Sequence, residues 1–269
     1  MVNVLKANGI QEPFSQDKIR LSVNRVGVPA NIQDKLISHV ESRLYEDIPT
    51  KEVYKQVNEF LQKETHPISA IKYKLKQSLM ELGPTGYPFE DFVSEILKAK
   101  GYLTQTRSVL MGKCVGHEID VIAEKKGIEK LMVEAKFHNA SGIHTDVHVS
   151  LYTKARFDDL KEKYQFDRAW LFTNTKITPD ALAYALCVNM GVVSWSYPQE
   201  ESLRDLVEKY HLYPITLLSS ISGPQKQILL ENHIVLISQI LNNESYLDFL
   251  ELQDEKKKSI ITEAKSISG

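Results

Sequence analysis

The feature that most constrains this chain is a pair of short apolar segments, residues 119–123 and 130–137, with charged side chains inside them. These segments and the short charged turn between them predict a β-hairpin. The charged residues are Asp120, Glu134 and Lys136. A charge in a half-buried strand is costly unless a partner or a metal compensates it. Because side chains alternate along a strand, Glu134 and Lys136 share one face, which Asp120 can reach from the neighbouring strand. Two carboxylates and an ammonium there suit a hard divalent cation and a phosphate.

An Asp followed across a hairpin by Glu-x-Lys resembles the core of the PD-(D/E)xK nucleases, and more narrowly the catalytic domain of Mrr-type restriction endonucleases. The motif alone also fits a surface hairpin with a cross-strand salt bridge. The surrounding order favours the nuclease-like domain, because a helix and a strand precede the hairpin and a helix, a strand, a helix and a strand follow it. We expect these elements at residues 89–100, 102–109, 150–164, 168–173, 178–190 and 192–198. The resemblance implies an α/β domain with a mixed central sheet.

The resemblance also implies a role for each residue of the hairpin motif. Asp120 and Glu134 would hold Mg²⁺ or Mn²⁺ with help from the carbonyl of Ala135. Lys136 would orient the attacking water or stabilise the developing negative charge. Mrr-like sequences often have Gln at the position of Glu134, whereas this chain has the acidic residue that is common in the wider superfamily.

A further carboxylate is expected on the helix at 89–100. Its apolar residues recur at helical spacing, and on a helical wheel Glu90 falls at the edge of the apolar face while Asp91 points the opposite way, into water. The Mrr-like family places a glutamate in this Phe-Glu pair, where it would support the catalytic lysine or a second metal. A solvated edge carboxylate is the alternative interpretation of Glu90.

The segment that follows Lys136 supplies candidate contacts to DNA. Its histidines invite a zinc interpretation, but their spacing is irregular and no cysteine is near. The helix after them carries cations at positions suited to phosphate contacts, although ordinary surface charge would also explain either cation alone. The candidate DNA contacts are His138, His144, His148, Lys154 and Arg156.

The N-terminal segment predicts a β-hairpin followed by four helices. Residues 2–6 and 10–14 form the strands around an Asn8-Gly9 turn. Ser15 is expected to cap the first helix, and Thr50 the third. The four helices are expected at residues 16–26, 31–44, 50–63 and 67–82.

This arrangement over residues 2–84 resembles the ATP-cone, a regulatory nucleotide-binding domain. The motifs that carry the resemblance are V-x-K-x-N-G, E-P-F-S-x-x-K-I, I-P-T and the closing L-G-P. The resemblance implies that two lysines meet the phosphates of ATP or dATP and that three further residues surround the nucleotide. The lysines are Lys6 and Lys18, and the others are Glu12, Ser15 and Thr50. One departure is Ala7, where the family often has Arg, so one cationic contact is missing. A helical module used for protein contacts is the alternative.

The segment 201–269 has a helical pattern. Two of its helices flank a turn through Gly223-Pro224, which loosely resembles a helix-hairpin-helix unit, a motif that holds a DNA backbone through turn amides. The usual G-x-G hairpin is absent, and helical packing or dimerisation explains the same pattern.

Composition narrows the class of protein. No run of eighteen apolar residues occurs, so no membrane span is expected. The two cysteines lie far apart without a partner motif, which fits a reducing cytosol and predicts a cytoplasmic protein. A formal net charge of −2 does not by itself indicate a nucleic-acid binder. No G-x-x-x-x-G-K-[ST] loop is present, so ATP hydrolysis is not expected.

Together these features predict an α/β protein of three parts: an ATP-cone-like domain at 1–86, an Mrr-like nuclease domain at 87–200 and a helical region at 201–269. The expected function is a Mg²⁺-dependent endodeoxyribonuclease regulated by ATP or dATP, and the ATP-cone resemblance suggests a homo-oligomer. The alternative is a non-catalytic, nucleotide-sensing DNA-binding regulator that keeps the nuclease fold. An RNA substrate also stays open.

Overall fold

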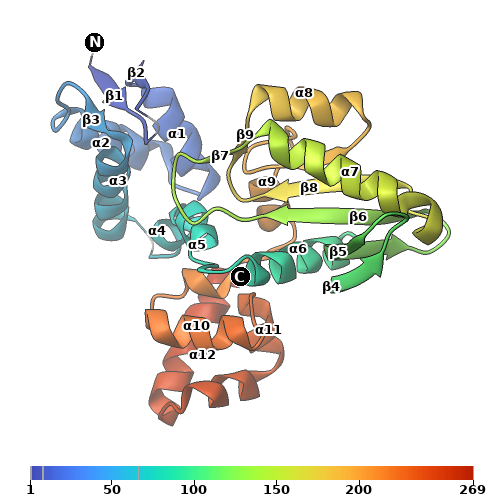
Figure 1. The fold of residues 1–269 in the computed structure, drawn as a ribbon. Helices are drawn as coiled ribbons and strands as arrows, with labels where there is room; N and C mark the ends of the chain where they lie inside the picture. Colours follow the sequence, from blue (N-terminus) through green and yellow to red (C-terminus); the bar gives the residue numbers. More distant parts are fainter. Residues whose placement is uncertain (1, 8, 66, 269) are drawn as a thin grey trace. The chain divides into compact units, whose positions relative to one another are not determined.

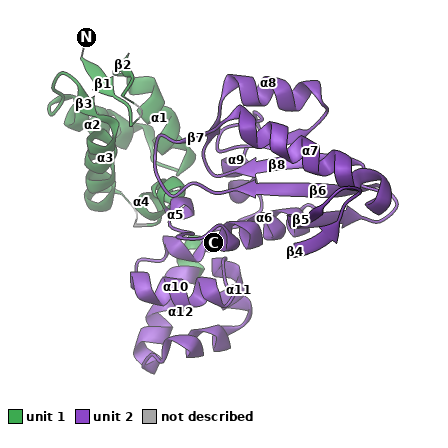
Figure 2. Cartoon of the chain, viewed as in Figure 1, with its two compact units in different colours: residues 1–77, 265–267, 269 green, residues 78–264, 268 purple. Residues whose placement is uncertain are grey.

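A computed structural model describes residues 2–7, 9–65 and 67–268, and its elements are drawn in Figure 1. The chain divides into two compact units (Figure 2). One unit comprises residues 1–77, 265–267 and 269, and the other comprises residues 78–264 and 268. Apart from residues 265–267 and 269, the segments for which we predict a nuclease-like domain and a C-terminal helical region therefore lie within one unit.

The first unit is built on a three-stranded sheet with the order β2-β1-β3. Strand β1 (Asn3–Leu5) pairs antiparallel with β2 (Gln11–Pro13), as the hairpin pattern predicts, although Asn8 lies outside the described residues. It also pairs parallel with the two-residue strand β3 (Ile48–Pro49), which the sequence analysis missed because two residues carry no alternation pattern.

Helices surround the buried core of the first unit. Ser15 caps the first of them, as predicted, by accepting a hydrogen bond from the amide of Lys18. The prediction of Thr50 as a cap is wrong, because the helix already includes Thr50 and its hydroxyl donates to the carbonyl of Leu5. The expected fourth helix is two short ones. The helices are α1 (Gln16–Arg25), α2 (Ala30–Glu41), α3 (Thr50–Glu64), α4 (Pro67–Tyr73) and α5 (Leu75–Met80).

The second unit contains a five-stranded mixed sheet with the order β10-β8-β6-β5-β4. The three strands nearest one edge form an antiparallel meander, and the next two run parallel to β6. This confirms the predicted mixed sheet. The strands are β4 (Leu103–Met111), β5 (Gly116–Lys125), β6 (Glu129–Lys136), β8 (Arg168–Thr173) and β10 (Gly191–Val193). A separate parallel pair, β7 (His144–Thr145) with β9 (Lys176–Ile177), was not predicted.

Helices cover both faces of this sheet (Figure 1). Helix α6 (Tyr87–Ala99) packs on one face through Phe89, Phe92 and Ile96, which are fully buried. Helices α7 (Val147–Tyr164) and α8 (Pro179–Cys187) cover the other face. Helix α8 starts where the sequence leaves Thr178 or Asp180 as the first residue: Thr178 is the cap, and Pro179 lies in the first turn.

A group of short helices completes the second unit, as the helical pattern of its sequence predicts. The turn before α10 is held from within, because the carboxylate of Glu263 accepts hydrogen bonds from the amides of Ser219 and Ser220 at 2.7 and 2.8 Å. The elements are α9 (Leu203–Lys209), η1 (Ile215–Leu217), α10 (Gly223–Glu231), α11 (Ile237–Asn242), η2 (Glu244–Leu250) and α12 (Asp254–Ser268).

The burial of α6 generates a stability prediction. Phe92→Ala removes a fully buried ring between α6 and the sheet, so we expect the free energy of unfolding of the second unit to fall by about 3–5 kcal/mol. Urea denaturation followed by tryptophan fluorescence measures the change. The matched control is Phe249→Ala, since that ring is 46% exposed and should cost less than about 1 kcal/mol. Equal losses from the two variants would contradict the packing described.

Candidate active site

The candidate site lies where the pairing of two strands in the central sheet ends. The ladder between β5 and β6 runs from Lys125–Glu129 to Val121–Val133 and stops there. Beyond it, the amide of Ala135 donates a hydrogen bond to Asp120 Oδ2 at 2.7 Å instead of to a backbone carbonyl. The carboxylate of Asp120 is thereby held between the two strands, next to the Glu-Ala-Lys segment of β6.

Strand β4 is also distorted at this point. Thr106 pairs with Val121 and Ser108 pairs with Ile119, but Arg107 between them has left-handed backbone geometry, with φ of 52°. Such geometry is unfavourable for a residue with a side chain, and strain of this kind tends to occur at functional sites. The distortion turns the guanidinium of Arg107 away from the ladder and towards helix α6.

Glu134 is a buried acid of the site. It is 8% exposed, and Arg156 Nη1 lies 2.6 Å from its Oε2. The hydroxyl of Tyr152 lies 3.4 Å from both carboxylate oxygens. Burial, together with the negative charge of Asp120, raises the pKa of Glu134 to about 7.

Lys136 supplies a positive charge from the same strand. Its charge lowers the pKa of both Asp120 and Glu134, although burial outweighs it and the pKa of each stays above the ordinary value. Within the described part of the chain, no hydrogen bond or ion pair engages the ammonium of Lys136. The ammonium is therefore available to a further anion.

Glu90 faces this group from helix α6, on the buried side that the helical wheel predicts. It is 8% exposed, and Arg107 Nη1 lies 3.3 Å from its Oε2. Burial is the main cause that raises the pKa of Glu90 to about 7, and the charge of Asp120 adds to it. The solvated edge carboxylate that was the alternative interpretation is not observed.

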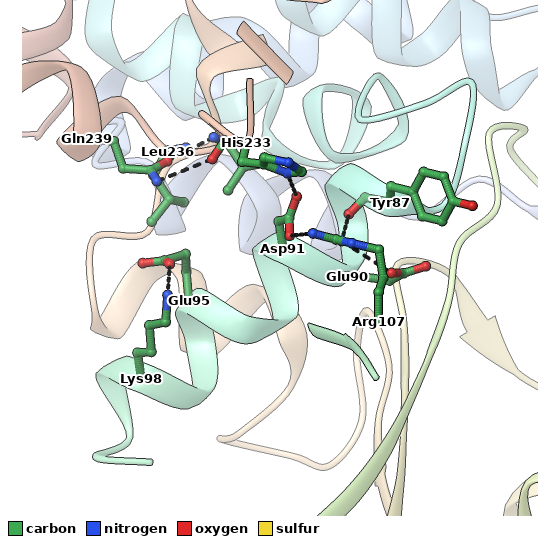
Figure 3. A network of polar contacts seen from close by, with 10 residues as sticks. Tyr87, Glu90, Asp91, Glu95, Lys98, Arg107, His233, Leu236 and Gln239 are labelled. Atoms are coloured by element: carbon green, nitrogen blue, oxygen red, sulfur yellow. Dashed lines mark hydrogen bonds and ion pairs between the residues drawn. The ribbon is translucent and has the colours of Figure 1, made fainter. Parts of the chain in front are cut away.

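The expectation that Asp91 faces water is wrong. Asp91 is buried and joins the polar network of Figure 3, in which Arg107 Nη2 lies 2.7 Å from its Oδ1. His233 follows helix α10, and its Nδ1 lies 2.9 Å from Oδ2 of Asp91. The helical wheel assigned that face to solvent because it could not anticipate the C-terminal helices that cover it. Through Asp91 and Arg107, these helices connect to Glu90.

A groove of about 980 Å³ opens beside these residues. Its lining includes Glu90, Asp120, Tyr152 and Arg156. Among the described lining residues of the groove, five are Asp or Glu and two are Lys or Arg. The acids are Glu90, Glu118, Asp120, Asp158 and Asp159, and the bases are Lys113 and Arg156. A polyanion can therefore approach closely only if added cations compensate the acids.

One wall of the groove is the β4–β5 turn, clamped to α7 by Asp159. Its carboxylate accepts hydrogen bonds from the amides of Cys114 and Val115 and lies 2.8 Å from His117 Nε2. The bond with His117 is the main cause of a strongly lowered pKa of Asp159. Gly112 is required in this turn, because a Cβ there would lie 2.0 Å from Asp159 Oδ2.

The residues present fit a hard divalent cation. The half-buried Asp120 and the buried Glu134 interact electrostatically and both have raised pKa values, and two such carboxylates ionise together only if a cation compensates them. Carboxylate and carbonyl oxygens, here with Ala135, are the ligands that Mg²⁺ and Mn²⁺ prefer. Among the described residues, no group of three or more His, Cys, Asp or Glu is arranged to hold a metal. The site therefore depends on two acids, a carbonyl and solvent or substrate oxygens.

The candidate DNA contacts occupy different surroundings. His138 is half-buried, with Nε2 3.0 Å from Thr145 Oγ1, and burial lowers its pKa. His144 and His148 are exposed. Lys154 pairs with Asp158 on its own helix. Arg156 is buried against Glu134 rather than on the outer surface of α7.

The structure brings the five candidate nucleotide residues of the first unit together. Lys6 Nζ and Lys18 Nζ lie 2.6 and 2.7 Å from the same oxygen of Glu12, and the bond with Lys18 is the main cause of a lowered pKa of Glu12. Ser15 caps helix α1, which contains Lys18. The hydroxyl of Thr50, at the start of α3, donates a hydrogen bond to the carbonyl of Leu5, the residue before Lys6. Two lysines beside two helix N-termini suit a phosphate group.

Four side chains of the site were missed in the sequence. Arg107 gave no signal, because left-handed geometry in the middle of a strand cannot be predicted from the residue type. Tyr152 was detectable, since it stands four residues before Arg156 on one helix. Asp91 and His233 are 142 residues apart in sequence, so no local pattern connects them.

Comparison with protein families identifies three matches along the chain. Residues 2–78 match the ATP cone domain, residues 83–198 match a restriction endonuclease family described as Mrr_cat, and residues 213–268 match the family AF1548-like, C-terminal. The first two matches confirm the domains that the motifs predict.

Two similar proteins extend the comparison. An uncharacterized protein of Archaeoglobus fulgidus is 36% identical over 177 residues, which cover 66% of this chain and 100% of the relative. A crystal structure titled protein of unknown function AF1548 superposes with a TM-score of 0.60 at 36% identity. That superposition covers 69% of this chain and 99% of the other.

The raised pKa of Glu90 predicts a pH-dependent contribution to stability. The folded-state pKa of about 7 exceeds the ordinary value of 4.5, so the folded state binds the proton more tightly between these values. Wild-type stability therefore falls as pH rises from 4.5 to 7, and Glu90→Gln removes that loss. At each pH the free energy of unfolding of wild type is subtracted from that of Glu90→Gln. We expect this difference to be about 1–3 kcal/mol larger at pH 8 than at pH 4.5.

Urea denaturation at both pH values measures this difference. The matched control is Glu95→Gln on the same helix, because Glu95 pairs with Lys98 nearer the surface. A stability difference for Glu90→Gln that is the same at both pH values would contradict the burial of an ionisable Glu90.

Proposed function

Since this chain belongs to the AF1548-like family and joins an ATP cone domain to a restriction endonuclease domain, we propose that it is a metal-dependent endodeoxyribonuclease regulated by ATP or dATP. The observation that carries the proposal is the position of Asp120, Glu134 and Lys136. They lie together where the β5–β6 ladder ends, within the matched restriction endonuclease domain.

In this proposal Asp120, Glu134 and the carbonyl of Ala135 hold Mg²⁺ or Mn²⁺. The ion, when bound, supplies positive charge that offsets the scissile phosphate and favours deprotonation of the attacking water. Asp120 is oriented for this task by the amide of Ala135. Because the site is buried, the interactions of its charged groups are screened less than they would be in water.

Lys136 acts on the substrate rather than on the fold. Its ammonium stands on the same strand as Glu134 and has no partner among the described residues. It is therefore free to orient the attacking water or to stabilise charge that develops on the phosphate. Glu90, fixed by Arg107, supports the lysine or a second metal from the side of helix α6.

The groove can accept DNA as the substrate when divalent cations are bound in it. Its acids outnumber its bases, so a phosphate backbone is repelled until divalent cations compensate them. Lys113 and the exposed His144 and His148 are left for phosphate contacts outside the acidic centre.

In the first unit, ATP or dATP is proposed to bind at Lys6 and Lys18. Glu12 bridges the two ammonium groups and keeps them together. A triphosphate carries more charge than a carboxylate and can take over these contacts. Regulation requires that the nucleotide bind two states of the protein with different affinity.

The second candidate function is a nucleotide-sensing DNA-binding regulator that does not cleave. Lys136, which has no partner among the described residues, stands beside two carboxylates, and this favours the enzyme, because a surface used only for binding would gain nothing from acids next to a phosphate. DNA binding that responds to ATP without metal-dependent cleavage would favour the regulator.

The cleavage prediction concerns Lys136. In Mg²⁺ or Mn²⁺ the wild-type protein is expected to nick supercoiled or methylated plasmid DNA, and Lys136→Ala and Asp120→Ala to lower the rate at least about a hundredfold. Agarose gel assays with and without ATP measure the rate. Lys126→Ala, in the exposed β5–β6 turn, is the control and should cleave like wild type.

Two outcomes would contradict the enzyme. One is cleavage that survives both site substitutions, because it would come from elsewhere. The other is the absence of cleavage on any DNA or RNA substrate while wild type and variants bind DNA alike, because this would favour the regulator.

The nucleotide prediction concerns Lys18. Its side chain is 63% exposed, so replacing it should remove a phosphate contact without disturbing the core. We expect Lys18→Met to weaken ATP binding at least about tenfold, measured by isothermal titration calorimetry. Lys35→Met, on the exposed face of helix α2, controls for the lost charge. Equal ATP affinity in wild type and Lys18→Met would place the nucleotide elsewhere.

A further inference from the structure

The buried ion pair between Arg156 and Glu134 has a consequence for metal binding. Arg156 Nη1 lies 2.6 Å from Glu134 Oε2, and Arg156 is 8% exposed. The guanidinium therefore stands directly against one of the two carboxylates proposed to hold the metal. Two cations cannot share a carboxylate at such distances without strong repulsion.

Arg156 and Tyr152 together close the site towards the groove. Both line it along with Asp120, whereas Glu134 does not contribute to the lining that the described residues form. The Tyr152 hydroxyl accepts a hydrogen bond from Arg156 Nη1 and lies 3.4 Å from Glu134 Oε1. A divalent cation entering from the groove reaches Asp120 first and meets the guanidinium before Glu134.

Arg156 also has a second position open to it. Its guanidinium already lies 4.9 Å from the centre of the Tyr152 ring, and that side chain is 48% exposed at the groove. A guanidinium is favourable on an aromatic face and presents a planar fork of donors that matches a phosphate. A small rotation of the Arg156 side chain along the ring would move its guanidinium further into the groove. Among the described lining residues of the groove, Lys113 is the other lysine or arginine.

We infer that Arg156 is the resident counter-ion of Glu134, which a divalent cation displaces, and that the released guanidinium contacts the DNA phosphate in the groove. The inference rests on the proposed function for its second half only. Arg156 thus compensates Glu134 in the metal-free protein and links the arrival of the metal to the binding of the phosphate. It acts through Glu134 before metal binding and on the substrate afterwards.

The test of the first half is metal affinity in the absence of DNA. Removing a positive charge a few ångström from the metal ligands should tighten Mn²⁺ binding by about tenfold in Arg156→Met, measured by calorimetry with the full chain. Arg156→Lys keeps the charge and should stay near the wild-type affinity. Lys154→Met is the matched control, because Lys154 is on the same helix but pairs with Asp158. Unchanged or weaker Mn²⁺ binding in Arg156→Met would overturn the inference.

A measurement on the unaltered protein guards against misfolding of the variant. The guanidinium N–H signals of Arg156, assigned by comparison with Arg156→Lys, should shift as Mg²⁺ is added to wild type. Signals that stay unchanged at saturating Mg²⁺ would mean that the Arg156–Glu134 contact persists, and would also overturn the inference.

The second half is tested by cleavage at saturating Mn²⁺. Arg156→Met should lose at least about tenfold in rate although it binds the metal more tightly, a combination that simple loss of structure would not produce. Wild-type cleavage that requires Lys136, with no gain in metal affinity in Arg156→Met, overturns this inference alone. Tighter metal binding in Arg156→Met without any wild-type cleavage supports the counter-ion role and rejects the proposed function.

Discussion

The enclosure of three carboxylates near the end of one strand ladder, two of them buried and one half-buried, is the constraint on which the second unit depends. Asp120, Glu134 and Glu90 come from two strands and a helix, and each has a raised pKa because burial disfavours its charge. An amide satisfies the first, and two arginines compensate the other two. The fold therefore keeps acids that an apolar core would exclude, at the cost of an arginine for each glutamate.

The need to compensate these carboxylates accounts for the local irregularities of the sheet. The left-handed Arg107 interrupts the β4–β5 ladder and reaches both Glu90 and Asp91, while the end of β5–β6 pairing leaves the amide of Ala135 free for Asp120. A regular β5–β6 ladder would use the amide of Ala135 for backbone pairing instead. The strain is local, and the surrounding buried core of Val121, Val133 and Phe92 holds it in place.

The sequence was sufficient for the parts of the fold that have a local cause. The motif Asp, Glu-x-Lys lies on the predicted hairpin, and Ser15 and Thr178 cap helices because their hydroxyls meet nearby amides. Prediction failed where the cause was distant. Asp91 faces the C-terminal helices rather than water, Thr50 bonds Leu5 rather than its own helix, and Arg156 turns inward because Glu134 is unpaired without it.

The contact of His233 with Asp91 changes how the C-terminal helices should be regarded. Just before the Gly223-Pro224 segment that resembles a helix-hairpin-helix turn, the amides of Ser219 and Ser220 are bound to Glu263. His233 meanwhile bonds Asp91, which shares Arg107 with Glu90. An uninterrupted series of polar contacts thus runs from the C-terminal helices to an acid of the candidate site (Figure 3). Because breaking such a series leaves a buried charge uncompensated, these helices support the site from behind, whether or not they also meet DNA.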